Sequence, residues 1–345
     1  MNLLIVGAGA VGATYGYIAS RLGPAGGANV TYLIKPKHRE DLKKGIQLYW
    51  WRGRTADPIL FEKFSLIDDV AELRTKKFDA VLITLPSDKF RADGWLERFL
   101  SDFSAGSPDG KIWSLQPGDS DQTYLEERLH GTADFRLVRG RIPIMGYLAP
   151  LPGESFDKPG YAFYIPKFSK AGWSSKNQAA AREAMTLFEN GGLPSKVVDD
   201  KPTPSSIFPV AVLRSVVAGL ERSEWSFDRL LNGENIHLVT SSLKEMTAIS
   251  AKTEKIVDPS VKWWGKLGAT PFALKTVIRL AQKIVPFDFE AFMRVHFMKV
   301  EGQMRMALDE DIGFAKRNGL STTNLVLLRG RKKPQTFEKR NDALI

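Results

Sequence analysis

The sequence of 345 residues contains no cysteine. This absence excludes disulfide bonds, metal sites built from thiolates and catalysis by a cysteine nucleophile. Histidine is also scarce, because only four are present and they lie far apart in the chain: His38, His130, His237 and His296. We therefore expect a protein that holds no metal ion.

Long hydrophobic runs are absent as well. A membrane-spanning helix needs about 20 consecutive apolar residues, and the best stretch, 207–220, is interrupted by Arg214. The apolar start, Met1–Val6, lacks the positively charged flank of a secretion signal and runs into glycines, so we interpret it as a first β-strand. These features favour a cytoplasmic protein without a membrane partner.

Basic residues outnumber acidic ones by 49 to 39, which gives a formal net charge of +10. The tail 329–345 holds six basic and two acidic residues and so contributes +4 of this charge. A moderately basic body suits an anionic cofactor and an anionic substrate. Nucleic acid is a less favoured partner, because its only local support is the aromatic and basic segment 49–54, which also fits an amphipathic strand.

The hydrophobic pattern predicts an α/β fold class in the first part of the chain and helices in the second. Apolar runs that alternate with helical stretches are typical of a doubly wound parallel sheet. We expect strands over Leu3–Val6, Asn29–Ile34, Gly45–Trp51, Ala80–Leu85 and Lys111–Leu115. The segment 201–205 reads as a linker because of its prolines and serine. We therefore predict a Rossmann-type domain over 1–200, an all-helical domain over 201–328 with helices near 206–231, 234–256, 271–283 and 287–318, and a basic tail over 329–345.

Six residues directly after the first predicted strand form the pattern of a dinucleotide-binding loop. They are Gly7, Ala8, Gly9, Ala10, Val11 and Gly12. The first glycine permits a tight turn, the second lets the backbone approach a pyrophosphate, and the third lets the following helix pack closely on the strand. The amides at the start of that helix attract the same anion. A strand, this loop and a helix in succession predict that the chain binds a nicotinamide dinucleotide.

The end of the second predicted strand indicates which dinucleotide is bound. Sites for NAD carry Asp or Glu there, which accepts hydrogen bonds from the adenosine ribose. Here the strand runs into Lys35, Lys37, His38 and Arg39 without a carboxylate. These side chains suit the 2′-phosphate of NADP(H) through charge-assisted contacts, and an exposed basic loop without a ligand is the alternative. We predict that the cofactor is NADP(H).

In these features the sequence resembles the ketopantoate reductase (2-dehydropantoate 2-reductase) family. The resemblance lies in the glycine loop followed by Gly16, the strand that ends at Lys35, the segment Asp79–Thr84, and the helix with its Gly-Leu-Pro sequence in Gln178–Pro194. It implies an NADPH-dependent reductase in which a Rossmann domain precedes a helical domain that binds the substrate. It also implies cofactor contacts after the central strands, at Thr84, Leu85, Pro86 and Gln116. A homodimer through the helical domain is compatible with this organisation.

The sequence departs from that family where the family performs its chemistry. The family commonly has lysine after the central strand, at the position of Pro86, and asparagine before a glycine where this chain reads Gln116-Pro117-Gly118. The first helix of the second domain should carry the catalytic lysine, yet 206–213 contains none. Gln303 stands where a substrate-binding glutamate is expected. The resemblance therefore implies a diverged member that lacks the usual catalytic lysine.

Other residues must then supply the chemistry, because reduction of a ketone needs a proton donor and a group that holds the substrate. In the predicted helix 287–318, His296, Lys299 and Gln303 recur at helical spacing and would share one face. His296 is our candidate proton donor, Lys299 and Gln303 are candidates for substrate binding, and an exposed polar stripe is the alternative. Arg214 is a further candidate for a substrate carboxylate, and it fits an ion pair with a nearby glutamate equally well.

Three functions are consistent with these residues. The first is NADPH-dependent reduction of a small carbonyl compound, such as a 2-oxo acid, in a cleft between the domains. The second is a catalytically silent NADPH-binding sensor or interaction protein. The third is an imine- or opine-type reductase, which joins an amine to a 2-oxo acid. In the first and third the partner is a small anionic or carbonyl substrate.

Overall fold

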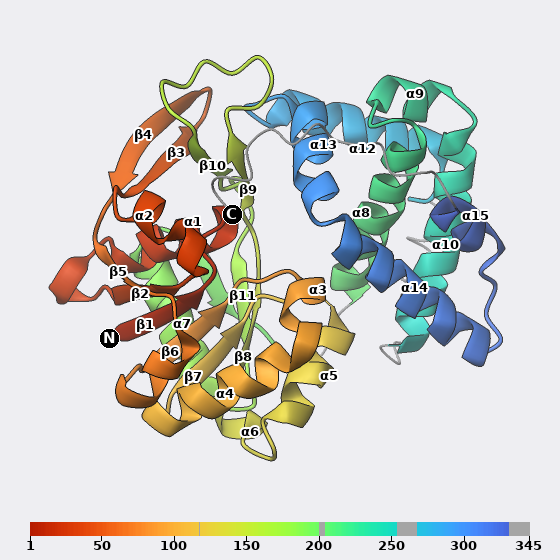
Figure 1. Cartoon of the computed structure of the whole chain (residues 1–345). Helices are drawn as coiled ribbons and strands as arrows, with labels where there is room; N and C mark the ends of the chain where they lie inside the picture. Colours follow the sequence, from red (N-terminus) through yellow and green to blue (C-terminus); the bar gives the residue numbers. More distant parts are fainter. Residues whose placement is uncertain (117, 200–203, 254–267, 331–345) are drawn as a thin grey trace. The chain divides into compact units, whose positions relative to one another are not determined.

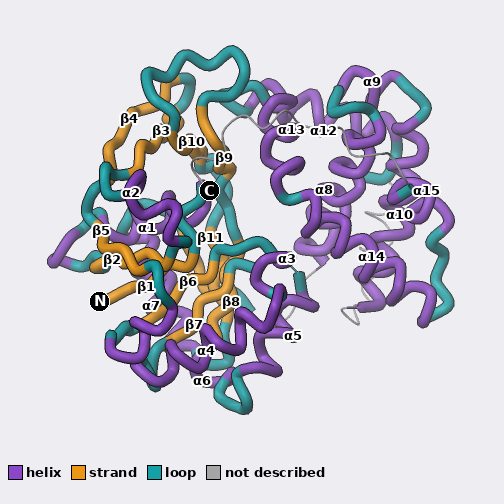
Figure 2. The backbone as a smooth tube through the Cα atoms, viewed as in Figure 1, coloured by secondary structure: helices purple, strands orange, loops and turns teal. Residues whose placement is uncertain are grey.

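A computed structural model describes residues 1–116, 118–199, 204–253 and 268–330 (Figure 1). The chain divides into two compact units, whose described parts are residues 1–199 and 204–330. The predicted linker 201–205 and the predicted tail 329–345 therefore lie mostly outside the described residues, as does Pro117. Among the described residues every strand lies in the first unit, and the second unit consists of helices joined by loops (Figure 2).

The first unit is built on an eight-stranded sheet. The strand order is β12–β11–β8–β7–β6–β1–β2–β5. Six neighbouring strands, from β8 to β5, run parallel, whereas β11 pairs antiparallel with β8 and parallel with β12. The bounds are β1 Asn2–Val6, β2 Asn29–Leu33, β5 Phe64–Ile67, β6 Ala80–Ile83, β7 Lys111–Ser114, β8 Leu137–Arg141, β11 Ala171–Ser174 and β12 Ser195–Val197. The predicted Rossmann-type sheet is confirmed, and β11 and β12 extend it with reversed direction.

Both faces of this sheet are covered, which explains why its central strands read as unbroken apolar runs. Leu3 and Ile5 of β1 belong to a hydrophobic cluster shared with α1 (Ala10–Ser20) and α7 (Gln178–Asn190). Leu4 and Val6 face the opposite cluster, which α4 and α5 help to form. The remaining helices of this unit are α2 Arg39–Leu42, α3 Ser87–Phe90, α4 Trp95–Gly106, α5 Asp119–Arg128 and α6 Ala133–Arg136. The polypeptide thus winds helices onto both sides of the sheet.

A second, four-stranded sheet in the first unit corrects one sequence-based expectation. Its order is β4–β3–β10–β9, with bounds Thr55–Phe61, Ile46–Arg52, Gly160–Tyr164 and Met145–Ala149. The strand expected over Gly45–Trp51 is therefore β3 of this sheet rather than part of the parallel sheet. Its aromatic and basic side chains contact each other, because the Trp50 ring lies 5.1 Å from the Arg21 guanidinium and 4.1 Å from that of Arg52. These cation–π contacts give the segment a role in packing.

The second unit is helical, as predicted, but two of the predicted helices are interrupted. They are α8 Pro204–Arg222, α9 Phe227–Asn232, α10 Asn235–Thr253, α12 Pro271–Ile284, α13 Phe289–Lys299, α14 Glu301–Arg317 and α15 Thr323–Arg329. The helix expected over 206–231 is interrupted where Glu224 and Trp225 adopt positive φ angles of 55° and 59°. The helix expected over 287–318 breaks at Val300, whose φ and ψ are −107° and 22°. Among the described residues, no helix is long and apolar enough to cross a membrane.

A buried carboxylate joins two helices of this unit. Glu245 of α10 is 9% exposed and accepts hydrogen bonds from the Ser321 hydroxyl, the Asn324 side chain, and the backbone amides of Asn324 and Leu325. Those amides belong to the first turn of α15, which lacks carbonyl partners of its own. Burial alone would raise the pKa of Glu245, but these hydrogen bonds outweigh it and the pKa is lowered. Glu245 therefore acts as a cap for α15 from a distant part of the chain.

Candidate functional site

The carboxyl ends of four parallel strands meet at one edge of the large sheet. Val6 of β1 pairs with Leu33 of β2 on one side and with Ile83 of β6 on the other, and Ile83 pairs with Ser114 of β7. The residues that follow these strands therefore lie side by side. We call this edge, with residues 7–12, 34–39, 84–87 and 115–116, the carboxyl-edge site. The chain leaves β1 for β2 on one side and returns to β6 on the other, which is where open α/β sheets bind ligands.

The glycine loop adopts the geometry that its sequence requires. Gly7 has a φ of +95°, a conformation that favours glycine, and its amide donates to the Leu33 carbonyl at 3.1 Å. A Cβ at Gly12 would lie 2.0 Å from the Gly7 carbonyl oxygen. In contrast, a Cβ at Gly9 would meet no atom within 4 Å. The loop is therefore packed tightly against the strand at Gly12 and open at Gly9.

The start of α1 offers free amide donors at this opening. Gly9 precedes α1, which begins at Ala10, and neither a side-chain cap nor an acidic residue occupies its first turn in the described structure. Ala8, Ala10 and Val11 are half-buried around the same turn. Uncapped amides at the positive end of a helix bind anions such as a pyrophosphate. The open space at Gly9 and these donors together fit a dinucleotide.

Side-chain hydrogen bonds tie the loops after β6 and β7 to the rest of the edge. Thr84 Oγ1 donates to the Val6 carbonyl at 2.7 Å, and Gln116 Nε2 donates to the Leu85 carbonyl at 2.7 Å. Gln116 is 5% exposed, so its amide serves mainly to join the two loops. Leu85 and Pro86 are half-buried beside it, and Pro86 directly precedes α3. These contacts fix the backbone where the nicotinamide half of a dinucleotide would lie.

A buried polar cluster behind these loops was not found from the sequence. Asp121 of α5 is 3% exposed, accepts a hydrogen bond from Ser87 Oγ at 2.5 Å and forms an ion pair with Arg91 at 2.6 Å. Gln122 Nε2 donates to the Gln116 carbonyl at 2.9 Å. The partners come from α3 and α5, and the polar sequence of α5 gave no periodic signal that Asp121 turns inward. The cluster connects the loops after β6 and β7 a second time.

The four basic residues after β2 differ in their surroundings. Lys35 and Lys37 are exposed and form no ion pair with the described residues. Arg39 instead forms an ion pair with Asp68, at 2.6 Å between Nη1 and Oδ1. His38 is 9% exposed, and burial lowers its pKa, an effect that the neighbouring Lys37 and Lys35 reinforce. Burial therefore disfavours the charged form of the His38 imidazole, and Lys35 and Lys37 are the exposed cations of this turn.

The candidate residues of the helical unit lie on two helices and not on the single helix that the sequence pattern predicts. His296 and Lys299 belong to α13, whereas Gln303 belongs to α14 beyond the break at Val300. The His296 ring stacks on Phe292 and meets Phe297 edge-on, with centroids 5.2 and 4.9 Å apart. Lys299 is exposed, and Gln303 is half-buried.

Arg214 has a carboxylate partner from another helix. Its guanidinium forms an ion pair with Asp311 of α14 at 2.6 Å, and both side chains are less than one-fifth exposed. The two residues are 97 positions apart. The sequence alternatives for Arg214 were a substrate carboxylate and a glutamate close by in the chain. The structure gives it a structural ion pair with a different partner.

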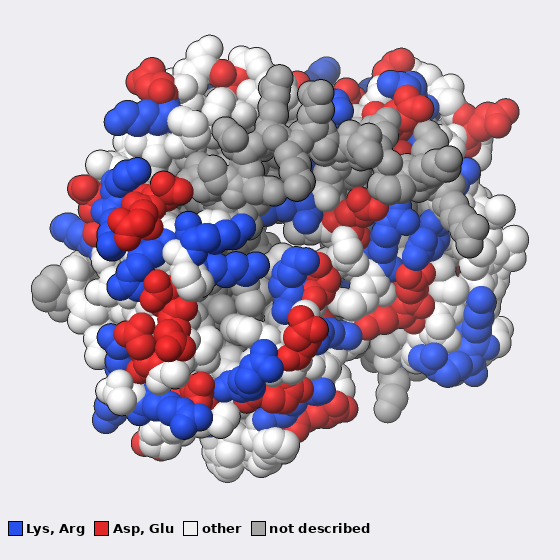
Figure 3. All heavy atoms as spheres, in the orientation of Figure 1, with Lys and Arg blue, Asp and Glu red and all other residues white. Residues whose placement is uncertain are grey.

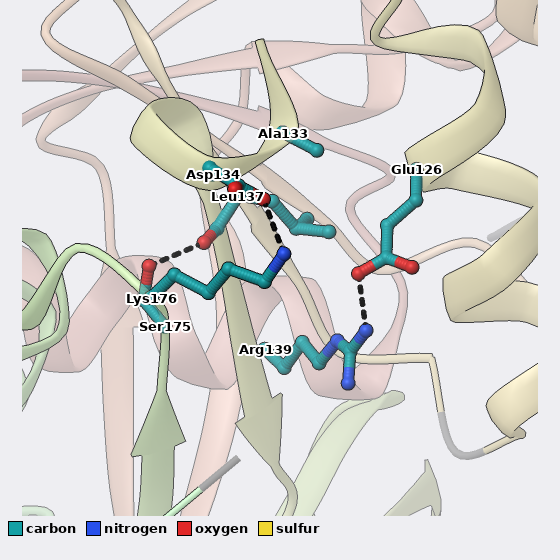
Figure 4. A pocket seen from close by; sticks show the side chains of 7 residues that line it. All are labelled: Glu126, Ala133, Asp134, Leu137, Arg139, Ser175 and Lys176. Carbon is teal, nitrogen blue, oxygen red and sulfur yellow. Dashed lines mark hydrogen bonds and ion pairs between the residues drawn. The ribbon is translucent and has the colours of Figure 1, made fainter. Parts of the chain in front are cut away.

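A small polar recess lies elsewhere in the first unit, near the start of β8 (Figure 4). Its charged side chains point toward one another: Lys176 pairs with Asp134 at 2.6 Å, and Arg139 pairs with Glu126. Ser175 donates to the Leu137 carbonyl at 2.6 Å. Because these groups satisfy each other, the recess offers little to a charged ligand.

The face of the molecule drawn in Figure 3 mixes basic and acidic side chains.

Comparison with known proteins shows which solved structures share this fold. No protein-family model matches the chain, and no curated protein sequence matches it. Solved structures do match. D-mandelate dehydrogenase in complex with NADH shares 15% identity, with 95% of this chain and 96% of that chain covered and a TM-score of 0.60. A dimeric ketopantoate reductase from Staphylococcus aureus shares 12% identity, with 95% and 96% covered and a TM-score of 0.60.

Octopine dehydrogenase in complex with NADH and agmatine is also similar. It shares 12% identity, with 95% of this chain and 88% of that chain covered and a TM-score of 0.57. At these identities the likeness shows the fold. The predicted resemblance to ketopantoate reductases is confirmed at that level, and the fold is shared with dehydrogenases solved with a nicotinamide dinucleotide.

Proposed function

We propose that this chain is an NADPH-dependent oxidoreductase that reduces a small carbonyl compound, such as a 2-oxo acid. The observation that carries the proposal is the carboxyl-edge site on one edge of a Rossmann-type sheet. It combines open space at Gly9, amides at the start of α1 without a side-chain cap, and two exposed lysines that form no ion pair with the residues that the structure describes. The fold shared with ketopantoate reductase, mandelate dehydrogenase and octopine dehydrogenase supports the same reaction class.

The roles proposed for the residues follow the order of the strands. Gly7 to Gly12 and the first turn of α1 bind the pyrophosphate. Lys35 and Lys37, beyond β2, bind the 2′-phosphate, because exposed ammonium groups pair well with a phosphate. Thr84, Leu85 and Pro86 border the nicotinamide half, and Gln116 holds that border in place through its bond to Leu85. The buried His38 helps to hold the turn that carries the two lysines.

Reduction of a carbonyl group to an alcohol requires the transfer of one hydride and one proton. A bound nicotinamide supplies a hydride to the carbonyl carbon, so that a 2-oxo acid, NADPH and a proton give a 2-hydroxy acid and NADP⁺. The proton must reach the carbonyl oxygen from a positioned donor. His296 remains our proposed donor, with Lys299 and Gln303 as proposed substrate contacts. Arg214 is the weakest of these proposals, because Asp311 already neutralises it.

The preference for NADPH over NADH rests on charge. Two of the three structures described above were solved with NADH, so the preference proposed here is argued from the residues that surround the end of β2 in this chain. Glu40 and Asp41 pair with Lys43 and Lys44, at 2.6 and 3.6 Å. Lys35 and Lys37 therefore keep their charge for a ligand. The positive charge of these lysines attracts the 2′-phosphate of NADPH more strongly than the uncharged 2′-hydroxyl of NADH.

The test is binding followed by turnover. Calorimetry with NADPH and NADH measures the cofactor preference, and the loss of NADPH absorbance with a panel of 2-oxo acids measures reduction. Tight NADPH binding with turnover supports the proposal. Tight binding without turnover on any carbonyl compound favours the silent NADPH-binding protein instead, and no binding of either dinucleotide overturns both.

An opine-type reductase is the second candidate, and the similarity to octopine dehydrogenase favours it specifically. Such an enzyme joins an amine to the 2-oxo acid with loss of water and reduces the resulting imine, so NADPH consumption requires both substrates. Turnover that appears only when an amine accompanies the 2-oxo acid would select this candidate. The carboxyl-edge site serves both reactions in the same way.

We also propose a homodimer through the helical unit, within a cytoplasmic enzyme. Helix α12 exposes Val277, Leu280 and Ile284, which recur at helical spacing and are 57%, 54% and 59% exposed, and Phe272 at its start is 81% exposed. Leu274 and Ile278, on another side of the helix, are buried in the unit. Exposed apolar surface of this kind marks a protein contact, and a two-fold axis would bury the same face of two copies.

A further inference from the structure

An acidic residue lies beside the end of β2, although the sequence places none on β2 itself. In the pairing of β2 with β5, Leu33 is opposite Ile67, and the Ile34 amide donates to the Ile67 carbonyl at 2.9 Å. The residue that directly follows β5 is Asp68, and neighbouring strands are about 4.8 Å apart. A carboxylate thus stands at the level of Ile34, where sites for NAD place the acid that binds the adenosine ribose.

Arg39 forms an ion pair with this carboxylate. Its Nη1 lies 2.6 Å from Asp68 Oδ1, and the side chains are 36% and 24% exposed. The next acid, Asp69, accepts a hydrogen bond from the Ala71 amide as the cap of a short helix. Arg39 is the only residue among those described that forms an ion pair with Asp68. The carboxylate is therefore held and compensated by a residue of the same turn that carries Lys35 and Lys37.

We propose that the Arg39–Asp68 ion pair determines the choice between NADPH and NADH. This inference rests on the proposed function and deepens it. With the pair intact, Asp68 does not accept hydrogen bonds from the ribose, and its charge does not repel a 2′-phosphate beside the two lysines. Without Arg39, the freed carboxylate accepts from the 2′-hydroxyl of NADH and repels the phosphate of NADPH. Asp68 is thus an acid that could bind the ribose, and its ion pair with Arg39 prevents it from doing so.

The test is a double-mutant cycle on cofactor binding. Dissociation constants for NADPH and NADH are measured by calorimetry for the wild type, Arg39→Gln, Asp68→Asn and the double variant. In Arg39→Gln we expect NADPH to weaken about tenfold relative to NADH, the size typical of coupling between close charges. In the double variant the repelling carboxylate is gone, so NADPH affinity should return to within about threefold of the wild type.

A structural role for the pair gives a different pattern. If Arg39→Gln weakens both dinucleotides equally, or if Asp68→Asn fails to restore NADPH in the double variant, the inference is overturned. Lys176→Gln is the matched control, since it removes a surface ion pair with Asp134 in the same unit and should leave both affinities unchanged. A wild type that binds neither dinucleotide overturns the proposed function itself. An unaltered preference in Arg39→Gln, with a wild type that prefers NADPH, overturns only the role of the pair.

Discussion

Replacing Gly9 by alanine distinguishes two roles of the glycine loop, which are the stability of the fold and the binding of the cofactor. The backbone of Gly9 has φ and ψ of −74° and −175°, which alanine adopts without strain, and the new Cβ meets no atom within 4 Å. The folded protein should therefore lose roughly 1 kcal/mol at most, from the poorer fit of alanine before a helix. For a unit of this size that corresponds to about 2–4 °C in Tm.

The same methyl group should interfere with the cofactor. It projects into the open space where the pyrophosphate would contact the backbone, and forced overpacking costs about 1–3 kcal/mol. NADPH and NADH should both weaken about 5- to 150-fold. Calorimetry measures the affinities, and thermal unfolding measures the stability. The reasoning is refuted if Gly9→Ala binds NADPH as tightly as the wild type.

Gly12→Ala is the informative contrast. There the Cβ would lie 2.0 Å from the Gly7 carbonyl oxygen and 2.9 Å from Thr84 Oγ1, so the backbone must move before any ligand binds. We expect a loss of about 3 kcal/mol in stability and a Tm lower by roughly 6–12 °C. A large decrease in Tm for Gly12→Ala with only a small one for Gly9→Ala would show that Gly12 is needed for close packing. Gly9 would then be the glycine that contacts the ligand.

Three further predictions concern charge and association. Lys35→Ala combined with Lys37→Ala should weaken NADPH about 10- to 100-fold and NADH less than about threefold, because charge-assisted contacts to the 2′-phosphate are lost; equal weakening would contradict this. Glu245→Gln should lower the Tm of the helical unit by several degrees at pH 7. Since the folded pKa of Glu245 is lowered, its contribution is present above the unfolded pKa of about 4.3 and disappears as pH falls through the folded pKa, so unfolding scans of the variant and wild type should converge in acid. Leu280→Glu should convert a dimer into monomers in light scattering, and an unchanged mass would exclude α12 as the interface.

The glycine loop could be predicted from the sequence because its requirements are local. The turn at Gly7, the opening at Gly9 and the close contact at Gly12 depend on a few consecutive residues and on the strand and helix that flank them. The Rossmann-type sheet followed from the same kind of information, since the alternation of apolar strands with helices is a property of neighbouring segments. Both expectations about the fold therefore agree with the structure.

The features that sequence reasoning missed depend on pairing between distant segments. Asp68 reaches the end of β2 only through the register of β2 with β5. Arg214 finds Asp311 across two helices, 97 residues apart in the chain. The helical pattern over 287–318 contains Gly302 close to the break at Val300, but a single glycine inside such a pattern does not by itself predict a break. A single sequence records none of these relations, because hydrophobic periodicity describes which face is buried and not which partner covers it.

Side-chain hydrogen bonds hold the loops after β6 and β7 in place. Three hydrogen bonds join Val6 to Thr84, Leu85 to Gln116 and Gln116 to Gln122. Gln116 thus links both loops while its amide is almost fully buried. In this chain these side chains hold the backbone of the two loops. A substitution such as Gln116→Ala should therefore change cofactor affinity by loosening the loops, with a loss of stability that accompanies the loss of binding, whereas Gly9→Ala should change binding alone.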